Sequence, residues 1–211
     1  MNEIEAMLTG KMNMRDFSPL VQHDPRIQQE LRDLIPPEAM DHPDHPFWKF
    51  ATYHFYERFQ FDVMRALNYI VKFNGSIGDN LNLFEEVKSL YFYHNPDLPY
   101  TSFYYDAHGL LLDISHDCYE GSEVNTFLEQ IVREALSIKG KGKQRAYGKE
   151  QIKKVFHAED GKRPYWIQGA DWPCGKNSPM KYVGRTRQGE CVYYEFMDVD
   201  THEKRIVEQY Y

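Results

Sequence analysis

The chain has 211 residues, of which 42% are apolar and 15% aromatic, and its formal net charge is −7. This composition excludes a disordered chain, and the length suffices to bury most of the apolar surface that the unfolded chain exposes. No apolar run is long enough to span a membrane, and the acidic N-terminus lacks the basic start of a signal peptide. We therefore expect a cytoplasmic protein.

The charge distribution and the cysteine content further limit the kinds of protein that this chain can be. Residues 1–137 hold 22 Asp/Glu against 10 Lys/Arg, whereas residues 138–211 hold 10 against 15, so the chain has an acidic body and a basic tail. The three cysteines are far apart and include no CxxC pair. This pattern favours a reducing compartment over a disulfide framework or a zinc site.

The first part of the chain predicts short helices. Residues 4–8 carry a small apolar face that ends at Gly10, a residue suited to a helix C-terminus. Asp24-Pro25 then provides an N-cap followed by proline in the first turn, and the apolar stripe that follows ends at Pro36-Pro37.

Longer helices are expected in the middle of the chain. The longest covers residues 47–73, where apolar side chains from Trp48 to Ile70 recur at helical spacing until NGSIGDN interrupts them. Residues 83–91 give another helical face. The segment 101–119 fits either a helix or a hairpin, and its spacing favours the helix. Residues 124–136 match the helical template at every step.

The period changes towards the C-terminus. Gly and Lys interrupt the pattern in KGKGKQRAYGK, and a short helix follows at residues 152–156. Alternation then predicts three strands, at residues 180–187, 190–199 and 204–210. The fold class is therefore α+β, with a mainly helical body (residues 1–160) followed by a Trp/Pro/Gly loop and a small antiparallel three-stranded sheet (residues 161–211), packed together as one unit.

The loop WIQGADWPCGKNSP connects the last helix to the first strand. Its tryptophans can pack into the seam between sheet and helices while glycine and proline set the bends. We expect a structural latch. The alternative is a recognition surface that presents Trp166 and Trp172 on a rigid loop.

The turn MDHPDHP and the helix after it hold the best candidates for a metal site. His42, His45 and His54 supply imidazole ligands, and Asp41 and Asp44 supply carboxylates. A metal-dependent hydrolase working through the three histidines is therefore one alternative function. However, proline follows both histidines of the turn, and an ordinary capped turn explains the same residues. No cofactor is expected.

A second alternative is nucleic-acid binding through the basic segment 139–154, which contains Lys139, Lys141, Lys143, Arg145, Lys149, Lys153 and Lys154. The acidic charge of the rest of the chain would repel a duplex, and no groove-reading motif accompanies the segment. A solvated loop and helix face is the default interpretation.

The C-terminal block carries a resemblance. Its pieces W-I-Q-G, W-P, G-K-N-S-P-M-K-Y and V-E-Q-Y-Y resemble a family of uncharacterised cytoplasmic proteins of Gram-positive bacteria, and LTGKMNMRDF, GDNLNLFEEV and CYEGSEV extend the likeness over most of the chain. W-P followed by a P-M-K-Y strand is also similar to bacterial proteins of the toxin-immunity kind. The resemblance implies a protein that binds a partner without catalysing a reaction, and it carries over no catalytic residue.

We therefore expect a non-enzymatic protein-binding module, an immunity or regulatory protein that neutralises a toxin or enzyme. An acidic surface suits a partner with a basic active cleft. The residues expected at the interface are Asp41, Asp44, Asp79, Glu85, Glu86, Trp166 and Trp172.

Overall fold

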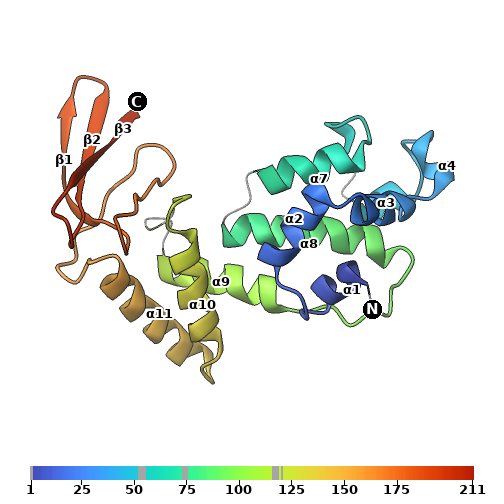
Figure 1. Cartoon of the computed structure of the whole chain (residues 1–211), viewed down its shortest axis with the longest axis horizontal. Helices are drawn as coiled ribbons and strands as arrows, with labels where there is room; N and C mark the ends of the chain where they lie inside the picture. The colour runs from blue at the N-terminus through green and yellow to red at the C-terminus, as the bar shows by residue number, and fades with distance from the viewer. Residues whose placement is uncertain (1, 52–55, 73–75, 116–118, 120) are drawn as a thin grey trace. The chain divides into compact units, whose positions relative to one another are not determined.

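The computed structural model describes residues 2–51, 56–72, 76–115, 119 and 121–211. It is an α+β protein in which helices precede a C-terminal antiparallel sheet (Figure 1). The chain forms two compact units. The first contains Met1–Asn74 and Gly78–Tyr105, and the second contains Gly75–Ile77 and Asp106–Tyr211. The expected boundary at residue 160 therefore lies inside the second unit, because the helices of residues 106–155 belong with the sheet.

The first unit is helical. Its elements are α1 (Glu3–Leu8), α2 (Met14–His23), α3 (Pro25–Asp33), α4 (Pro37–Met40), α5 (Phe47–Phe50), α7 (Val63–Lys72) and α8 (Ile77–Phe92). The first three helices begin at side-chain caps, since Asn2, Asn13 and Asp24 each accept a hydrogen bond from a backbone N–H of the first turn. The predicted α1 and α3 are confirmed, whereas α2 was not predicted.

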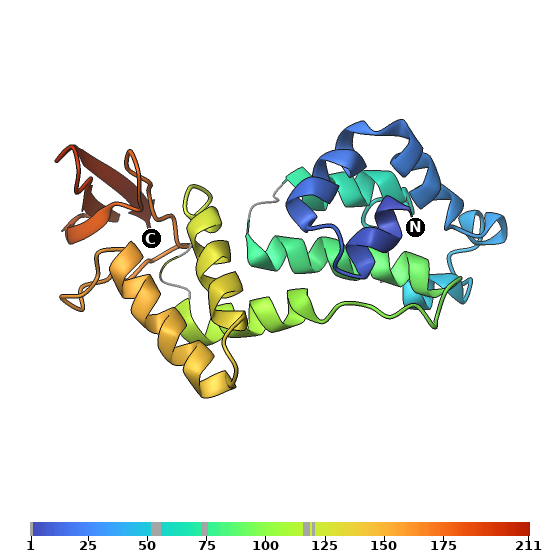
Figure 2. The same cartoon turned by 60° about the horizontal axis from the view of Figure 1, so that its bottom comes forward.

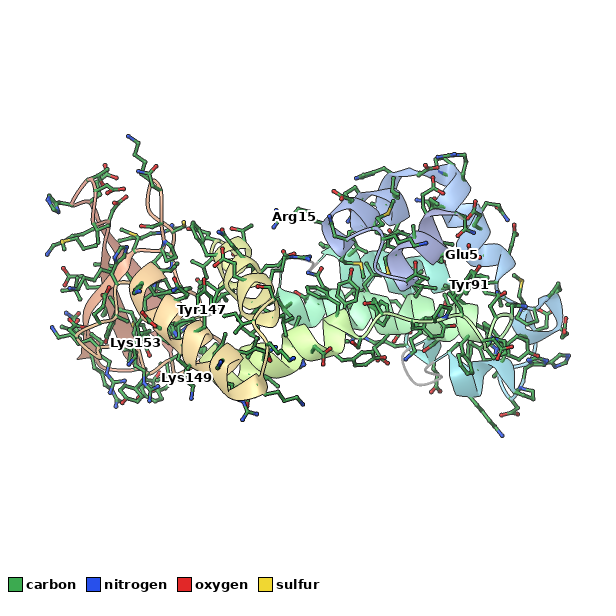
Figure 3. All side chains as sticks on the ribbon, turned by 90° about the horizontal axis from the view of Figure 1, so that it is seen from below. Glu5, Arg15, Tyr91, Tyr147, Lys149 and Lys153 are labelled. Carbon is green, nitrogen blue, oxygen red and sulfur yellow. The ribbon has the colours of Figure 1, made fainter. Side chains whose placement is uncertain are left out.

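Aromatic side chains fill the core of this unit. Phe17, Trp48 and Phe84 are at most 1% exposed. At the edge of the core, the Tyr91 hydroxyl of α8 donates a hydrogen bond of 2.5 Å to the Glu5 carboxylate of α1 (Figure 3). Burial, and then this bond, raises the pKa of Tyr91 well above its usual range. The pair therefore joins the first and last helices of the unit through a neutral phenol donor.

The prediction of one continuous helix over residues 47–73 is wrong. Gln60 and Phe61 adopt left-handed backbone angles, with φ of 56° and 60°, and a helix cannot continue through two such residues. A new helix then starts after Asp62, whose side chain accepts a hydrogen bond from the Arg65 N–H at 3.0 Å. Apolar periodicity extends across this break because α5 and α7 both contribute to the same core.

The second unit combines helices and the sheet. Its elements are the end of α9 (Phe103–Ser115), α10 (Asn125–Leu136), α11 (Lys141–Val155), β1 (Lys181–Gln188), β2 (Cys191–Met197) and β3 (Lys204–Tyr210). The strands are antiparallel in the order β1-β2-β3. Figure 2 shows α10 and α11 side by side, as their contacts require. The helix predicted over 101–119 is confirmed for residues 103–115, and the three strands lie within about two residues of their predicted ends.

The Gly- and Lys-rich segment predicted to interrupt the helices is instead the first part of α11. The glycine at the centre of α11, Gly148, explains why the segment is helical and not a loop. A Cβ atom at Gly148 would lie 2.8 Å from Cδ1 of Ile114, so the absence of a side chain allows α11 to approach α9 closely. Here tertiary packing outweighs the low helix propensity of glycine.

The Trp/Pro/Gly loop packs against the sheet as a latch. Trp172 is fully buried, its indole N–H donates to the Met180 carbonyl at 2.8 Å, and its ring lies 5.1–5.3 Å from those of Tyr119, Phe156 and Phe196. Trp166 is half-buried against Tyr194 and Phe196. The stacking of these rings joins the end of α11 to the inner face of the sheet.

Candidate functional site

The structure does not bring the predicted metal ligands together. His42 is exposed, and the Nδ1 atom of His45 accepts a hydrogen bond from the backbone N–H of Phe47 at 3.2 Å. His54 lies outside the described residues. Within the described ranges, no group of three or more His, Cys, Asp or Glu side chains is arranged to hold a metal ion. The His45 ring instead caps the backbone where α5 begins.

The predicted interface carboxylates divide into two sets. Asp41 and Asp44 are exposed in the turn between α4 and α5, whereas Asp79 and Glu85 are half-buried on α8. Glu86 was expected next to an exposed turn, and this is wrong, since it is 8% exposed. The helix α8 starts at Ile77 and its inner face includes Glu86.

Glu86 has a structural neighbour in the core. Its carboxylate lies beside the Tyr56 hydroxyl, and Tyr56 is fully buried. Burial, and then the charge of Glu86, raises the pKa of Tyr56 well above its usual range, so the phenol is neutral. The two side chains are enclosed within the first unit.

A better candidate surface is the turn that contains Asp41 and Asp44, which we call the acidic turn (residues 37–46). Met40 is 55% exposed there, between the exposed carboxylates of Glu38 and Asp41. None of the three carboxylates, Glu38, Asp41 or Asp44, forms an ion pair with a described residue. An exposed apolar side chain thus belongs to the same short segment as three exposed carboxylates that form no ion pair with a described residue.

Hydrogen bonds fix the backbone of the acidic turn. The indole N–H of Trp48, which is 1% exposed, donates to the Ala39 carbonyl at 2.9 Å. The backbone N–H of Ala39 donates to the Pro36 carbonyl at 2.8 Å, and that of His45 donates to the His42 carbonyl at 2.9 Å. Proline residues restrict the same stretch. The acidic turn, which consists of α4 and the residues that follow it (Figure 1), therefore presents Met40 on a fixed backbone.

Sequence reasoning missed Met40. It selected the acidic residues beside it for their charge, but a lone methionine between helices carries no signal of exposure. Met40 is exposed because Ala39, its neighbour, faces inward with 1% exposure and bonds to Trp48. Methionine at such a position is typical of binding surfaces, where its flexible side chain adapts to a partner.

The two tryptophans predicted at an interface lie in the latch of the second unit. Trp172 has no exposed surface, so it cannot contact a partner in this conformation, and that expectation is corrected. Its ring is covered by those of Tyr119, Phe156 and Phe196, and its backbone runs close to Gly121, where a Cβ atom would lie 2.5 Å from the Trp172 nitrogen. Trp166 remains half-buried.

The basic segment 139–154 forms most of the exposed side of α11. Two of its cations are paired, since Arg145 bonds to Asp113 at 2.7 Å and Lys154 bonds to Glu150 at 2.7 Å. Lys149 and Lys153 are exposed on the helix that also bears Tyr147 (Figure 3). The Tyr147 hydroxyl donates to Glu134 at 2.7 Å, which places a further carboxylate beside the lysines.

The chain matches no protein-family model, and no curated protein or solved structure matches it. In the part of the chain that the structure describes, no helix has the length and apolar character needed to cross a membrane.

Proposed function

We propose that this chain is a non-enzymatic protein-binding module of the immunity or regulatory kind, which binds a basic partner protein at the acidic turn. The observation that carries the proposal is Met40, 55% exposed among carboxylates that lack ion-pair partners in the described structure. The partner would be a toxin or enzyme of the bacterial cytoplasm, in keeping with the resemblance of the C-terminal block.

The chemistry of the acidic turn suits such a partner. Protein interfaces are enriched in methionine and aromatic residues at their centre and are polar at the rim. Met40 would fill an apolar pocket, while Asp41 and Asp44 would face basic groups around it. The charge of the first unit adds to this, because residues 1–105 hold 15 Asp/Glu against 9 Lys/Arg, a net −6. Such a field accelerates association with a basic surface.

The fixed backbone of the turn also favours binding. A surface that is already held in its bound conformation loses little conformational entropy on association. The hydrogen bond from Trp48 to Ala39 provides this fixation from inside the core. The turn therefore resembles a preorganised protein-binding site more than a flexible linker.

Affinity capture with matched variants tests the proposal. The tagged full-length protein, Met40→Ala and Asp41→Asn/Asp44→Asn are incubated with lysate of a Gram-positive bacterium at low and high salt, and retained proteins are quantified by mass spectrometry. Asp97→Asn/Glu57→Gln serves as the control, since it removes two exposed carboxylates elsewhere in the first unit. The captured protein is then purified, and its 1:1 binding and its loss of activity are measured by calorimetry and enzyme assay.

We expect a basic protein that the wild type and the control retain equally. Met40→Ala should weaken its binding about tenfold, as truncation of a central apolar contact does. Asp41→Asn/Asp44→Asn should mainly slow association and reduce its dependence on salt. The proposal is wrong if the turn variants and the control retain every captured protein alike.

A further inference from the structure

The second unit carries an exposed surface on which arginines and tyrosines alternate. It consists of Tyr165, Arg185, Arg187 and Tyr211, which we call the arginine–tyrosine face. Tyr165 is 63% exposed and Tyr211 is 67% exposed, and both arginines are exposed. Single exposed tyrosines are common on protein surfaces, so exposure alone does not distinguish this surface. Its distinguishing feature is that each of the two exposed rings lies beside an exposed arginine.

A bulge in β1 brings the two arginines onto one face of the sheet. Tyr182 pairs with Phe196, and the register shifts before Gly184 pairs with Glu195. Arg185 and Arg187 then stand opposite Tyr194 and Val192, on the side of the sheet that faces the latch. Strict alternation from Tyr182 would have put both arginines on the other face.

Each arginine is placed against its own tyrosine. The Arg185 guanidinium donates to the Tyr165 carbonyl at 3.2 Å, and its carbon lies 5.9 Å from the Tyr165 ring centroid. The Arg187 guanidinium carbon lies 4.4 Å from the ring centroid of Tyr211, and its Nε atom donates to the Gly189 carbonyl at 2.8 Å. The Tyr194 hydroxyl, which donates to the Tyr165 carbonyl at 2.7 Å, fixes the backbone of the first pair.

The segments that carry this face are mostly basic, and the exposed Glu190 adjoins them, since its carbonyl accepts from the Tyr211 N–H at 3.0 Å. Neither residues 161–169 nor residues 181–189 contain an Asp or Glu, and together they hold Lys162, Arg163, Lys181, Arg185 and Arg187. The Arg163 guanidinium also lies 5.8 Å from the Tyr165 ring centroid. Lys181 is 3.8 Å from Asp160. The face on α11 differs, because carboxylates of Glu134, Glu150 and Asp113 lie among its cations and it lacks an exposed aromatic ring.

We propose that the arginine–tyrosine face binds single-stranded nucleic acid. Proteins that hold single strands combine cations for the phosphates with aromatic rings on which bases stack. Arg185 and Arg187 are two residues apart on one strand, a separation of about 7 Å, and each has a ring beside it. Two pairs of cation and ring, one at each arginine of β1, therefore provide two contacts for phosphate and two rings for stacking.

A duplex would not use this surface in the same way, since its bases are stacked on one another and their faces are closed to tyrosine. The carboxylates of an acidic protein could pair with the arginines, but such a protein has no row of bases that could stack on Tyr165 and Tyr211. The site lies in the second unit and uses no residue of the acidic turn, so the proposal is independent of the proposed function.

Fluorescence anisotropy with the full-length protein tests it. The probes are a labelled thymidine homopolymer, a labelled duplex of equal length and inorganic polyphosphate as competitor, each measured over a series of salt concentrations. We expect the single strand to bind more tightly than the duplex. Tyr165→Ala and Tyr211→Ala should each weaken it about tenfold through lost stacking. Arg185→Gln/Arg187→Gln should reduce the slope of log K against log salt by about 1.4, as expected for two phosphate contacts.

Two control variants distinguish binding at the arginine–tyrosine face from a non-specific effect of positive charge. Lys149→Gln/Lys153→Gln removes the same charge from α11 and should leave the slope unchanged. Thr186→Arg/Arg187→Thr keeps the composition but moves one cation to the other face of β1, opposite Tyr193, and should weaken binding as loss of Arg187 does. Tyr211 is 67% exposed, so its variant reports on binding even where another variant fails to fold.

The proposal is overturned by any of four results. The first is that the single strand does not bind at low salt, and the second is that the duplex binds equally well. The third is that both tyrosine variants keep the wild-type affinity. The fourth is that the α11 control variant loses binding while the variants of the arginine–tyrosine face keep it. Competition by poly-glutamate as strong as that by the single strand would assign the face to an acidic protein and would also refute it.

Discussion

The latch of the second unit depends on one buried amide, and replacing that amide should measure its contribution. The Gln209 side chain of β3 is 4% exposed. Its Oε1 atom accepts from the backbone N–H groups of Ile167 and Gln168, both at 3.0 Å, and its Nε2 atom donates to the Gly169 carbonyl at 2.7 Å. Gln209→Leu keeps the size of the side chain and removes all three hydrogen bonds.

The expected loss follows from these bonds. Each contributes about 1 kcal/mol net, so three contribute about 3 kcal/mol. The full penalty for unsatisfied buried groups does not apply, because Gln168 and Gly169 are exposed and water can reach their backbone. The leucine recovers about 1 kcal/mol through its buried apolar surface. We therefore expect a loss of about 2 kcal/mol in unfolding free energy, or about 4–8 °C in Tm.

Urea denaturation followed by tryptophan fluorescence measures this loss. A Trp48→Phe background removes the signal of the first unit, so that Trp166 and Trp172 report on the latch alone. Gln209→Glu is the matched control: its carboxylate still accepts from both N–H groups but faces the Gly169 carbonyl, and we expect an intermediate loss. Hydrogen exchange at the Ile167 and Gln168 amides should accelerate in Gln209→Leu. A loss below about 0.5 kcal/mol, the range of neutral surface changes, would refute the reasoning.

Three other changes test the packing and the charges of the second unit. Gly175→Ala should destabilise it by about 1–3 kcal/mol in a thermal melt, because the new Cβ would lie 2.5 Å from the Asp198 carboxylate. Gly142→Ala, in α11, meets no atom within 4 Å and should stabilise the protein by up to about 1 kcal/mol in the same assay. Hydrogen bonds from Arg205 lower the pKa of Glu123, so the folded state binds that proton less tightly than the unfolded chain. The stabilisation by this pair is complete above the ordinary Glu pKa of about 4.3 and is lost as the pH falls through the lower pKa. Arg205→Gln should therefore flatten the acid side of the stability curve, by less than about 1 kcal/mol since both groups are largely exposed.

The fold could be predicted wherever a single period dominates. The stripe of α10 and the alternation of β3 gave their elements directly, since each buries one side of the element. The break between α5 and α7 was not predictable from periodicity, because the left-handed residues Gln60 and Phe61 leave the apolar spacing intact. Similarly, glycines in α11 indicated a loop, although Gly148 is there for close packing on Ile114.

The candidate sites were harder to predict because they depend on which side chains remain exposed. Trp172 and Tyr165 are seven residues apart in one loop and look alike as aromatic anchors, yet the first is 0% and the second 63% exposed. Their difference comes from partners distant in sequence, since Phe156 and Phe196 cover Trp172 while Arg185 lies beside Tyr165. These partners cannot be predicted from the residues of the loop alone.

The arginine–tyrosine face shows most clearly what a sequence pattern omits. Counting alternate residues from the buried Tyr182 assigns Arg185 and Arg187 to the opposite face of the sheet. That face carries Tyr193, the residue that pairs with Thr186, and the arginines would be ordinary solvated cations there. The register shift between Tyr182 and Gly184 reverses that assignment. An extra residue in a strand disturbs pairing, and bulges are common on edge strands such as β1 as well as beside functional sites. The bulge in β1 places two cations beside exposed rings, which is the arrangement that the proposed binding of a single strand requires.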